Sequence, residues 1–302
     1  MYKLIAIDMD GTLLRKDKSI SNTTYKAIQK AKEKDVKIVL STGRPVQGVS
    51  KALDFLDLNN KNTYIVSCSG ALVKCASGEI ISENNLSFEE VNYLYNLSKE
   101  LNINLNAVTH NNFLTPSFNF TTEVESYMTN LPVKVVDFEN LDKNIPINRI
   151  AFINETENFI NRLKNILKYK KIDLKYNLQN TNVSNKSDSL FSSEENLPKE
   201  LYERFTVLKP TSNTLEILNK NVNKGTGVAS LAEKLGIKRE DIICIGDSGN
   251  DIHMLKYAGL GVAMGNAFPE VKAIADYVTL SNEEDGVAHV INKFILQEED
   301  LL

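Results

Sequence analysis

The chain has 302 residues, of which 42% are hydrophobic and 25% are charged, and its formal net charge is -4. This composition is typical of a globular protein with room for two domains, and it excludes a chain that is disordered throughout. The negative net charge disfavours a nucleic-acid partner, because binding to a phosphate backbone depends on clustered lysine and arginine.

The first apolar run, residues 4–7, is typical of a buried strand, and two carboxylates follow directly after it. Gly11 permits a sharp turn, so we expect Asp8 and Asp10 at the carboxyl end of this strand, where open α/β sheets bind ligands. Residues i and i+2 of a strand point the same way, so one metal ion or phosphate could contact both acids. A turn that merely closes a loop is the alternative, and on this segment alone the two interpretations have about equal weight.

Two further strand patterns, residues 36–40 and 64–67, each follow a helical pattern, and Ser21 or Asn22 caps the first of these helices. This alternation predicts an α/β fold with a Rossmann-like, doubly wound parallel sheet covered by helices on both faces. After residues 36–40 the chain reads Ser-Thr-Gly-Arg (41–44), where hydroxyls, backbone amides and the arginine could hold an anion. This signal is weak by itself, because Ser and Thr are ordinary helix caps.

The pattern changes between Leu86 and Pro210, where helical segments alternate with short strand-like runs. We interpret this stretch as an inserted α+β domain. Its least ordered part is expected at residues 180–199, which are rich in Ser, Asn and Glu and lack apolar periodicity. We expect the chain to return to the first domain near residues 214–217.

The remaining candidate site residues follow the point where we expect the chain to return to the first domain. Lys224 precedes a helical pattern, although a lone lysine is usually a solvated surface residue. Residues 242–245 form another apolar strand pattern, which leads to Asp247 and then to Asn250 and Asp251 at a helix start. Beside the first strand in one parallel sheet, this strand end would complete a set of oxygen ligands of the kind that Mg²⁺ prefers. A helix cap would explain Asn250 or Asp251, but it leaves Asp247 unexplained.

In this order, the segments D-x-D-G-T, S-T-G-R, N-K-G and G-D-x-x-N-D resemble the haloacid dehalogenase (HAD) superfamily of phosphohydrolases. The two leucines after the first motif, with residues 261–267 and 281–288, are similar to the Cof-type branch, which carries a C2-type (C2B) cap. The resemblance implies that residues 1–85 and 211–302 form a HAD-like Rossmannoid catalytic core. It also implies that residues 86–210 form the inserted α+β cap domain, although this middle part matches only in length and general pattern.

The resemblance implies a role for each motif residue. Asp8 is the implied nucleophile, which becomes an aspartyl-phosphate, and Asp10 is the implied general acid and base. Mg²⁺ is implied at the carboxylates of Asp8 and Asp247 and at the main-chain oxygen of Asp10. The other implied site residues are Thr42, Gly43, Lys224 and Asn250, which hold the phosphate, Arg44, which contacts phosphate or substrate, and Asp251, which orients Lys224 or metal-bound water.

The implied function is that of a magnesium-dependent phosphatase acting on small phosphorylated metabolites, such as sugar phosphates. A phosphomutase of the same fold is one alternative, and a non-catalytic regulatory or binding module is another. We expect a small phosphomonoester as partner, with no nucleic acid and no membrane. A cytoplasmic location is expected, because no apolar segment reaches membrane-spanning length and the first strand begins too early for a leader. The sequence predicts neither the particular substrate nor the oligomeric state.

Overall fold

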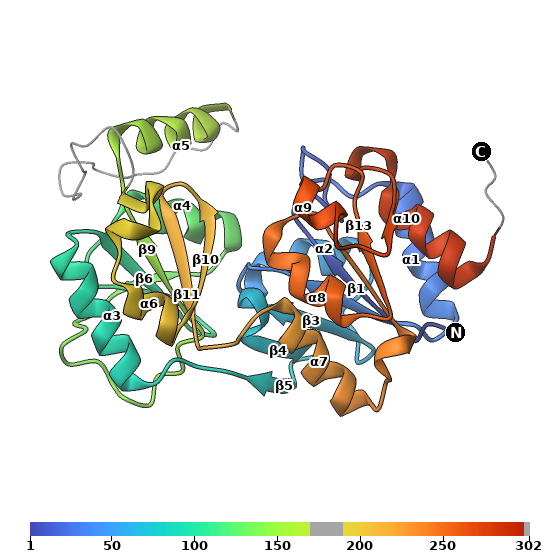
Figure 1. Cartoon of the computed structure of the whole chain (residues 1–302), viewed down its shortest axis with the longest axis horizontal. Coiled ribbons are helices and arrows are strands. Elements are labelled where there is room, and N and C mark those ends of the chain that lie inside the picture. The colour runs from blue at the N-terminus through green and yellow to red at the C-terminus, as the bar shows by residue number, and fades with distance from the viewer. Residues whose placement is uncertain (170–189, 299–302) are drawn as a thin grey trace. The chain divides into compact units, whose positions relative to one another are not determined.

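A computed structural model describes residues 1–169 and 190–298 of the chain (Figure 1). The chain divides into two compact units. The first unit comprises Met1–Glu83 and Val222–Leu302, and the second comprises Asn84–Asn221. The second unit is therefore an insertion, because the chain leaves the first unit once and later re-enters it.

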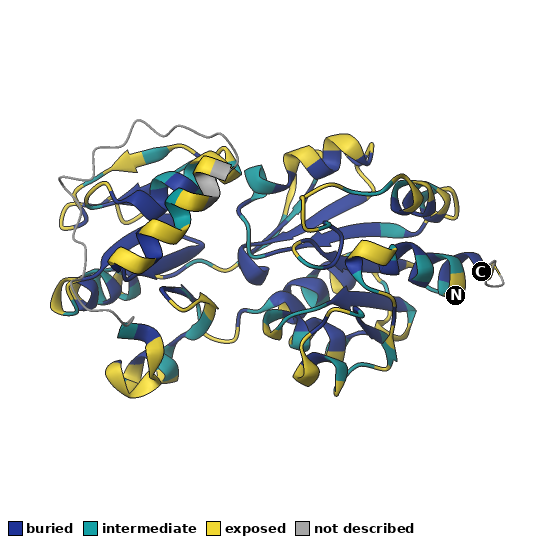
Figure 2. Cartoon of the chain, turned by 90° about the horizontal axis from the view of Figure 1, so that it is seen from above, coloured by how far each residue is buried: buried dark blue, intermediate teal, exposed yellow. Residues whose placement is uncertain are grey.

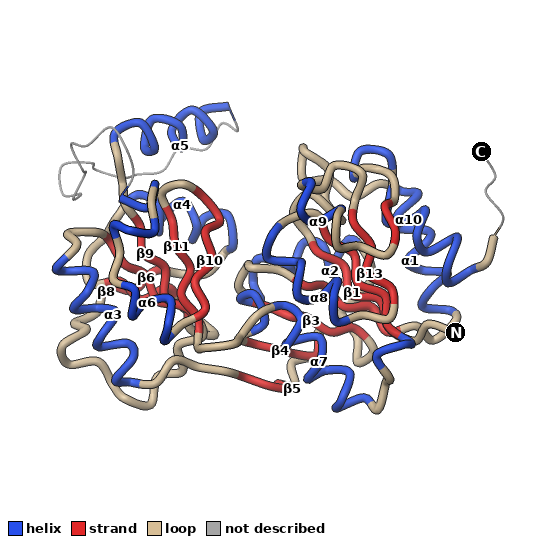
Figure 3. The backbone as a smooth tube through the Cα atoms, in the orientation of Figure 1, coloured by secondary structure: helices blue, strands red, loops and turns tan. Residues whose placement is uncertain are grey.

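The first unit is built on an eight-stranded sheet, whose order in the described part of the chain is β14-β13-β12-β1-β2-β3-β4-β5. Strands are drawn in red in Figure 3. Neighbouring strands from β14 to β3 run parallel, and β4 and β5 extend one edge in antiparallel fashion. The central strands are buried (Figure 2), which explains why their sequences are continuous apolar runs. This sheet has the α/β arrangement that the alternation of strands and helices predicts. Its strands are β1 (Leu4–Asp8), β2 (Lys37–Ser41), β3 (Thr63–Ser67), β4 (Leu72–Cys75), β5 (Ile80–Glu83), β12 (Ile242–Gly246), β13 (Leu260–Ala263) and β14 (Tyr277–Val278).

Helices cover this sheet, with α1 packed against α10 and α7 packed against α8. Ser21 caps the first of them, because its hydroxyl accepts a hydrogen bond of 2.9 Å from the amide of Thr24. Asn22 is the first residue of the helix proper. The helices of this unit are α1 (Asn22–Glu33), α2 (Ser50–Phe55), α7 (Lys224–Leu235), α8 (Ile252–Tyr257), α9 (Pro269–Lys272) and α10 (Gly286–Val290).

The second unit contains a mixed sheet with the order β10-β11-β9-β6-β7-β8. Only the β7–β8 pair of this described sheet is parallel. One face of the sheet carries an apolar core that includes Leu105, Phe152 and Ile217. The elements of this unit are β6 (Asn104–Val108), β7 (Phe113–Thr115), β8 (Val133–Val135), β9 (Arg149–Ile153), β10 (Thr206–Thr211) and β11 (Thr214–Leu218), with α3 (Phe88–Glu100), α4 (Phe120–Thr129), α5 (Glu157–Tyr169) and α6 (Lys199–Arg204).

The expected return point of the chain is wrong. Residues 214–217 belong to β11, which pairs with β9 in the second sheet and places Leu215 opposite Phe152. Their apolar side chains complete the core of the second unit, so the chain re-enters the first unit only at Val222, later than the expected boundary after residue 210.

The segment 180–199, expected to be the least ordered, lies partly outside the described residues, which exclude 170–189. Its later part contains short 3₁₀ turns at Leu190–Ser192 and Glu194–Asn196. Among the helices of the described ranges, none combines the length and the apolar character needed to cross a membrane.

Candidate active site

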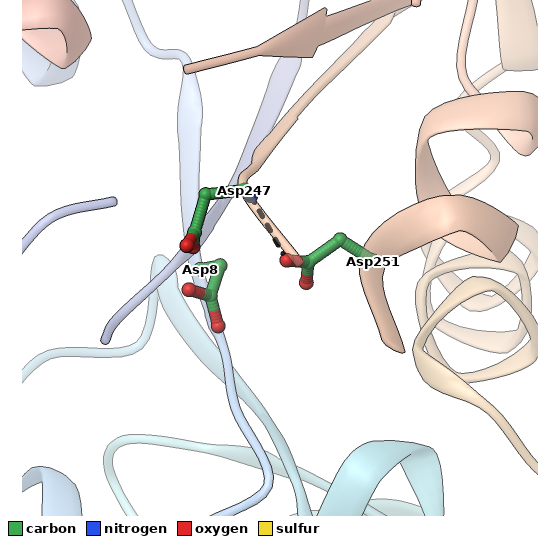
Figure 4. A group of neighbouring side chains, drawn as sticks. All are labelled: Asp8, Asp247 and Asp251. Carbon is green, nitrogen blue, oxygen red and sulfur yellow. Dashed lines mark hydrogen bonds between the residues drawn. The ribbon is translucent and has the colours of Figure 1, made fainter. Parts of the chain in front are cut away.

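Two neighbouring parallel strands bring the two acidic motifs together. Ile7 on β1 pairs in register with Ile245 on β12, so both strands end at the same edge of the sheet. Asp8 is the last residue of β1, and Asp247 follows β12 directly. Figure 4 shows Asp8 and Asp247 close together, with Asp251 facing them from the turn after β12. One carboxylate oxygen from each of the three residues lies within 4.8 Å of the others.

Lys224 links two of these acids. It is the first residue of α7, and its side chain is buried. Its Nζ lies 2.6 Å from Oδ1 of Asp8 and 2.6 Å from Oδ1 of Asp251. Burial of a lysine is tolerated here because both hydrogen bonds run to carboxylates.

Asp251 is held by several donors. While Oδ1 accepts from Lys224, Oδ2 accepts hydrogen bonds of 3.0 Å each from the amides of Asp247 and Ser248. The Ser248 hydroxyl also donates to Oδ2, at 3.3 Å. Both oxygens of Asp251 therefore accept hydrogen bonds, and this carboxylate is one of the three that could hold a metal ion.

The inner cluster has more carboxylates than ammonium groups. Burial raises the pKa of Asp8 well above its usual value, the charge of Asp251 adds to the rise, and Lys224 opposes it. Burial likewise raises the pKa of Asp247, to about 6, with the charge of Asp251 adding to the rise and a hydrogen bond from Thr12 opposing it. Burial alone would lower the pKa of Lys224, but Asp251 and Asp8 raise it, so the ammonium stays charged.

This donor set fits a divalent cation. Carboxylate oxygens are the ligands that Mg²⁺ and Ca²⁺ prefer. Burial and, after it, repulsion from neighbouring carboxylates raise the pKa values of Asp8 and Asp247, and a bound cation would offset the repulsion. The turn after Asp8 is shaped around this cluster. Gly11 has φ 87°, and a Cβ at this position would lie 2.4 Å from Oδ2 of Asp247, so a larger residue cannot occupy the turn unchanged.

The Ser-Thr-Gly-Arg segment begins at the last residue of β2, the strand on the other side of β1. Asp8 pairs with Ser41 at the end of β2, so Thr42 lies at the same edge of the sheet. Thr42 is buried, and its hydroxyl accepts a hydrogen bond of 3.1 Å from the amide of Arg44. Gly43 lies between these two residues.

Asp10 lies in a different environment from Asp8. Its side chain is 42% exposed and lies between two cations. Arg44 donates from Nε to Oδ2 at 2.8 Å and from Nη2 to Oδ1 at 2.6 Å, and Lys18 Nζ donates to Oδ1 at 2.7 Å. Burial acts to raise the pKa of Asp10, but the hydrogen bonds and charges of Arg44 and Lys18 together lower it.

The structure brings the predicted residues together in two groups. Asp8, Asp247, Asp251 and Lys224 form the inner cluster, and Asp10 pairs with Arg44 beside it. Asn250 lies on the turn after β12, where its Oδ1 accepts a hydrogen bond of 2.8 Å from the Ser248 hydroxyl. Thr42, Gly43 and Asn250 lie in the segments that follow β2 and β12, the two strands that flank β1.

Sequence reasoning missed several neighbours of the site. The Thr12 hydroxyl donates to Oδ1 of Asp247 at 3.0 Å, and Lys18 contacts Asp10. A turn after β3 supports the Ser-Thr-Gly-Arg segment, because the amide of Ser69 donates to the carbonyl of Thr42 at 3.0 Å. Ser69 has φ 53°, a conformation that is uncommon outside glycine and that no pattern in the sequence signals.

Comparison with known proteins agrees with this geometry. A family model of haloacid dehalogenase-like hydrolases matches residues 5–291. The chain is 36% identical over 299 residues to YxeH of Bacillus subtilis (strain 168), provisionally named a phosphatase, with 98% of this chain and 99% of YxeH covered. It is 31% identical over 294 residues to YcsE of the same strain, named 5-amino-6-(5-phospho-D-ribitylamino)uracil phosphatase, with 97% of this chain and 96% of YcsE covered.

The fold is also similar to that of a solved structure. A haloacid dehalogenase-like hydrolase from Bacteroides thetaiotaomicron superposes with a TM-score of 0.76 at 27% identity, covering 98% of this chain and 100% of that one. The predicted fold class, a mainly parallel core sheet with an inserted α+β unit, is thereby confirmed. The family match, the relatives and the shared fold together establish that this chain belongs to the haloacid dehalogenase-like hydrolases.

Proposed function

We propose that this protein is a magnesium-dependent phosphatase that hydrolyses small phosphorylated metabolites through a phosphorylated Asp8. Its enzyme class, phosphoric monoester hydrolase, follows from the family and from relatives that are named phosphatases. The observation that carries the proposed mechanism is the position of Asp8. This carboxylate is buried at a strand end, and Lys224 fixes one of its oxygens at 2.6 Å.

Asp8 is the proposed nucleophile. An oxygen of its carboxylate attacks the phosphorus of the substrate, a bond from that oxygen to phosphorus forms, and the bond to the leaving oxygen breaks. Lys224 and Asp251 support this role by fixing the orientation of the attacking carboxylate. Water then attacks the phosphorus of the aspartyl-phosphate, which releases inorganic phosphate and restores Asp8.

Asp10 is the proposed proton-transfer residue. It donates a proton to the leaving oxygen in the first step and accepts one from the attacking water in the second. The lowered pKa of Asp10, between Arg44 and Lys18, suits the second step directly. The first step requires Asp10 to take up a proton, and the negative charge of a bound phosphate favours this uptake while Arg44 and Lys18 still hold the carboxylate.

The proposed Mg²⁺ ligands are the carboxylates of Asp8 and Asp247 and the main-chain oxygen of Asp10. Two unit charges about 4 Å apart repel by roughly 4 kcal/mol at an effective dielectric near 20, which would slow the reaction by about three orders of magnitude. A bound cation supplies compensation for the repulsion between the Asp8 carboxylate and an anionic phosphate.

The proposed phosphate contacts are Thr42, the amide of Gly43, Lys224 and Asn250, with Arg44 contacting phosphate or substrate. Positive or hydrogen-bond-donating groups of this kind stabilise the charge on the transferring phosphoryl group. We assign the first unit as the catalytic core and the second, Asn84–Asn221, as the cap that excludes water and selects the substrate.

A panel of phosphomonoesters, assayed for release of inorganic phosphate with and without Mg²⁺, tests this proposal. We expect release from at least one sugar phosphate or phosphorylated cofactor precursor in the presence of Mg²⁺ and none after chelation. The Asp8→Asn variant serves as the control and should be inactive. Absence of release from every phosphomonoester in the panel would overturn the proposal, and transfer of the phosphoryl group to a sugar would identify a phosphomutase.

A further inference from the structure

The carboxylate of Asp10 is held by a lysine as well as by Arg44. Lys18 Nζ lies 2.7 Å from Oδ1 of Asp10, the same oxygen that accepts from Nη2 of Arg44 at 2.6 Å. We propose that Lys18 is a positioning residue for proton transfer by Asp10. This inference rests on the proposed function, in which Asp10 exchanges protons with the leaving oxygen and with water.

The two oxygens of Asp10 are not equivalent. In the described part of the chain, Oδ1 accepts hydrogen bonds from both Lys18 and Arg44, whereas Oδ2 accepts one, of 2.8 Å, from Nε of Arg44. An ionised carboxylate has about four lone-pair sites, so Oδ2 keeps more free acceptor capacity than Oδ1. Because Lys18 adds a second hydrogen bond to Oδ1, Oδ2 is the oxygen that exchanges a proton. Arg44 alone would not distinguish the two oxygens, because it donates one hydrogen bond to each.

The backbone holds Lys18 at this place. Its φ is 68°, in the left-handed region, and its amide donates to the carbonyl of Arg15 at 2.9 Å. The amide of Arg15 donates in turn to the carbonyl of Ser19 at 2.9 Å, which closes the turn. A non-glycine residue in the left-handed region costs energy, and such residues concentrate at functional sites.

The same turn is tethered to a distant part of the first unit. The guanidinium of Arg15 pairs with Asp285 at 2.9 Å, and the amide of Lys16 donates to the carboxylate of Glu283 at 2.8 Å. These contacts restrict the movement of the turn. The Lys18 side chain itself is 44% exposed, so its pairing with Asp10 contributes little to stability and a purely structural role explains it poorly.

The test compares Lys18→Gln with two matched variants. Lys18→Arg keeps the cation, and Lys16→Gln removes an exposed charge from the same turn without touching Asp10. Rates are measured with an alkyl phosphate, whose leaving oxygen needs a proton, and with 4-nitrophenyl phosphate, whose leaving group does not. For the alkyl phosphate we expect Lys18→Gln to lower kcat about 10-fold, a part of the total effect of general acid–base catalysis, with KM nearly unchanged.

Lys18→Arg should restore most of the lost kcat, and Lys16→Gln should behave as the wild type. The burst of 4-nitrophenolate from the first turnover should have the same rate constant in the wild type and in Lys18→Gln. Lys18→Gln should cause no further loss in the Asp10→Asn background, because the lysine acts through that carboxylate. Thermal unfolding of each variant checks that the fold is retained.

Several outcomes would overturn the inference. They are an unchanged kcat in Lys18→Gln, a rise in KM as its main effect, an equal loss in Lys16→Gln, or a further loss in the Asp10→Asn background. Failure of the proposed function gives a different result, since the wild type would then release no phosphate from any phosphomonoester.

Discussion

Asp8 and Asp10 are two residues apart on one strand end, yet they lie in opposite environments. Asp8 is buried beside Lys224, and its pKa is raised by burial and by neighbouring carboxylates. The Asp10 side chain is 42% exposed, and its pKa is lowered because Arg44 and Lys18 outweigh the effect of burial. Spacing along the strand brings both acids to the same edge, and the residues around each one then determine its chemistry.

The two environments also differ in charge balance. The inner cluster holds three carboxylates, those of Asp8, Asp247 and Asp251, against the single ammonium of Lys224. The outer group holds two cations, Arg44 and Lys18, against one carboxylate. Excess negative charge suits a metal ion inside, and the two outer cations hold the carboxylate of Asp10 by charge-assisted hydrogen bonds.

The largest expected effect is that of Asp8→Asn on activity. The amide has nearly the shape of the carboxylate but is a poor nucleophile, so we expect kcat to fall by about 10⁴-fold or more. Phosphate release with Mg²⁺ measures the loss, and circular dichroism shows whether the fold persists. Activity near the wild-type level would remove Asp8 from the mechanism.

Asp10→Asn should have the next largest effect. Loss of general acid and base catalysis lowers rates by about 10²–10⁴-fold. Alkyl phosphates should be affected most in the first step, and hydrolysis of the phosphorylated enzyme should slow for every substrate. Single-turnover kinetics separates these steps, and equal effects on good and poor leaving groups in the first step would contradict the acid role.

The different environments of Asp8 and Asp10 depend on two kinds of residue. Acids that follow apolar strands can be predicted from the sequence, whereas an exposed lysine that pairs with one of them cannot. Asp8 and Asp247 each follow an apolar strand run, so their meeting at one sheet edge follows from the parallel order of β1 and β12. Lys18 is an exposed lysine in a charged turn, and nothing in its spacing separates it from ordinary surface lysines.

Some strands of the second unit likewise cannot be predicted from the sequence pattern. Strand β6 contains the buried residues Asn104 and Asn106, which interrupt the apolar pattern expected of a buried strand. Asn106 is tolerated inside because its amide donates to Thr122 at 3.0 Å and to Glu125 at 3.1 Å. Such pairings depend on tertiary contacts, so the local sequence pattern signals neither this strand nor the place of β11 in the same sheet.

Lys224→Met should affect stability more than any exposed lysine does. It leaves the buried carboxylates of Asp8 and Asp251 without their ammonium partner, and breaking a buried pair costs about 3–5 kcal/mol. Urea unfolding of the metal-free protein measures the change. Lys234→Met, at an exposed position on the same helix, is the matched control. Equal stabilities of the two variants would contradict the buried pairing.

The smallest predicted effect concerns pH and metal. Because the pKa of Asp247 is raised to about 6, its carboxylate becomes protonated, and metal affinity falls, as the pH drops through that value. We therefore expect Mg²⁺ to raise Tm clearly at a pH of about 7.5 and little at about 5. In Asp247→Asn the stabilisation by Mg²⁺ should be weak at both values. A Tm shift in the wild type that does not depend on pH would contradict this assignment.

Without metal, the pH dependence of stability has the opposite sign. A folded-state pKa above the unfolded value means that the folded state binds more protons between the two values. Asp247 therefore stabilises the metal-free fold most at a pH below the usual Asp pKa. This stabilisation is lost as the pH rises through about 6. The difference between the wild type and Asp247→Asn, measured without metal across this range, isolates that contribution.

The most direct measurement of the central claim is the site of phosphorylation in Asp10→Asn. This variant is mixed with 4-nitrophenyl phosphate, whose leaving group needs no proton, and Mg²⁺, and it is then quenched in acid, digested and examined by mass spectrometry. We predict one phosphoryl group on the peptide containing residues 4–14, assigned by fragmentation to Asp8 and absent from the Asp8→Asn/Asp10→Asn double variant. Phosphate release by the wild type together with a phosphoryl group on another residue would contradict the account.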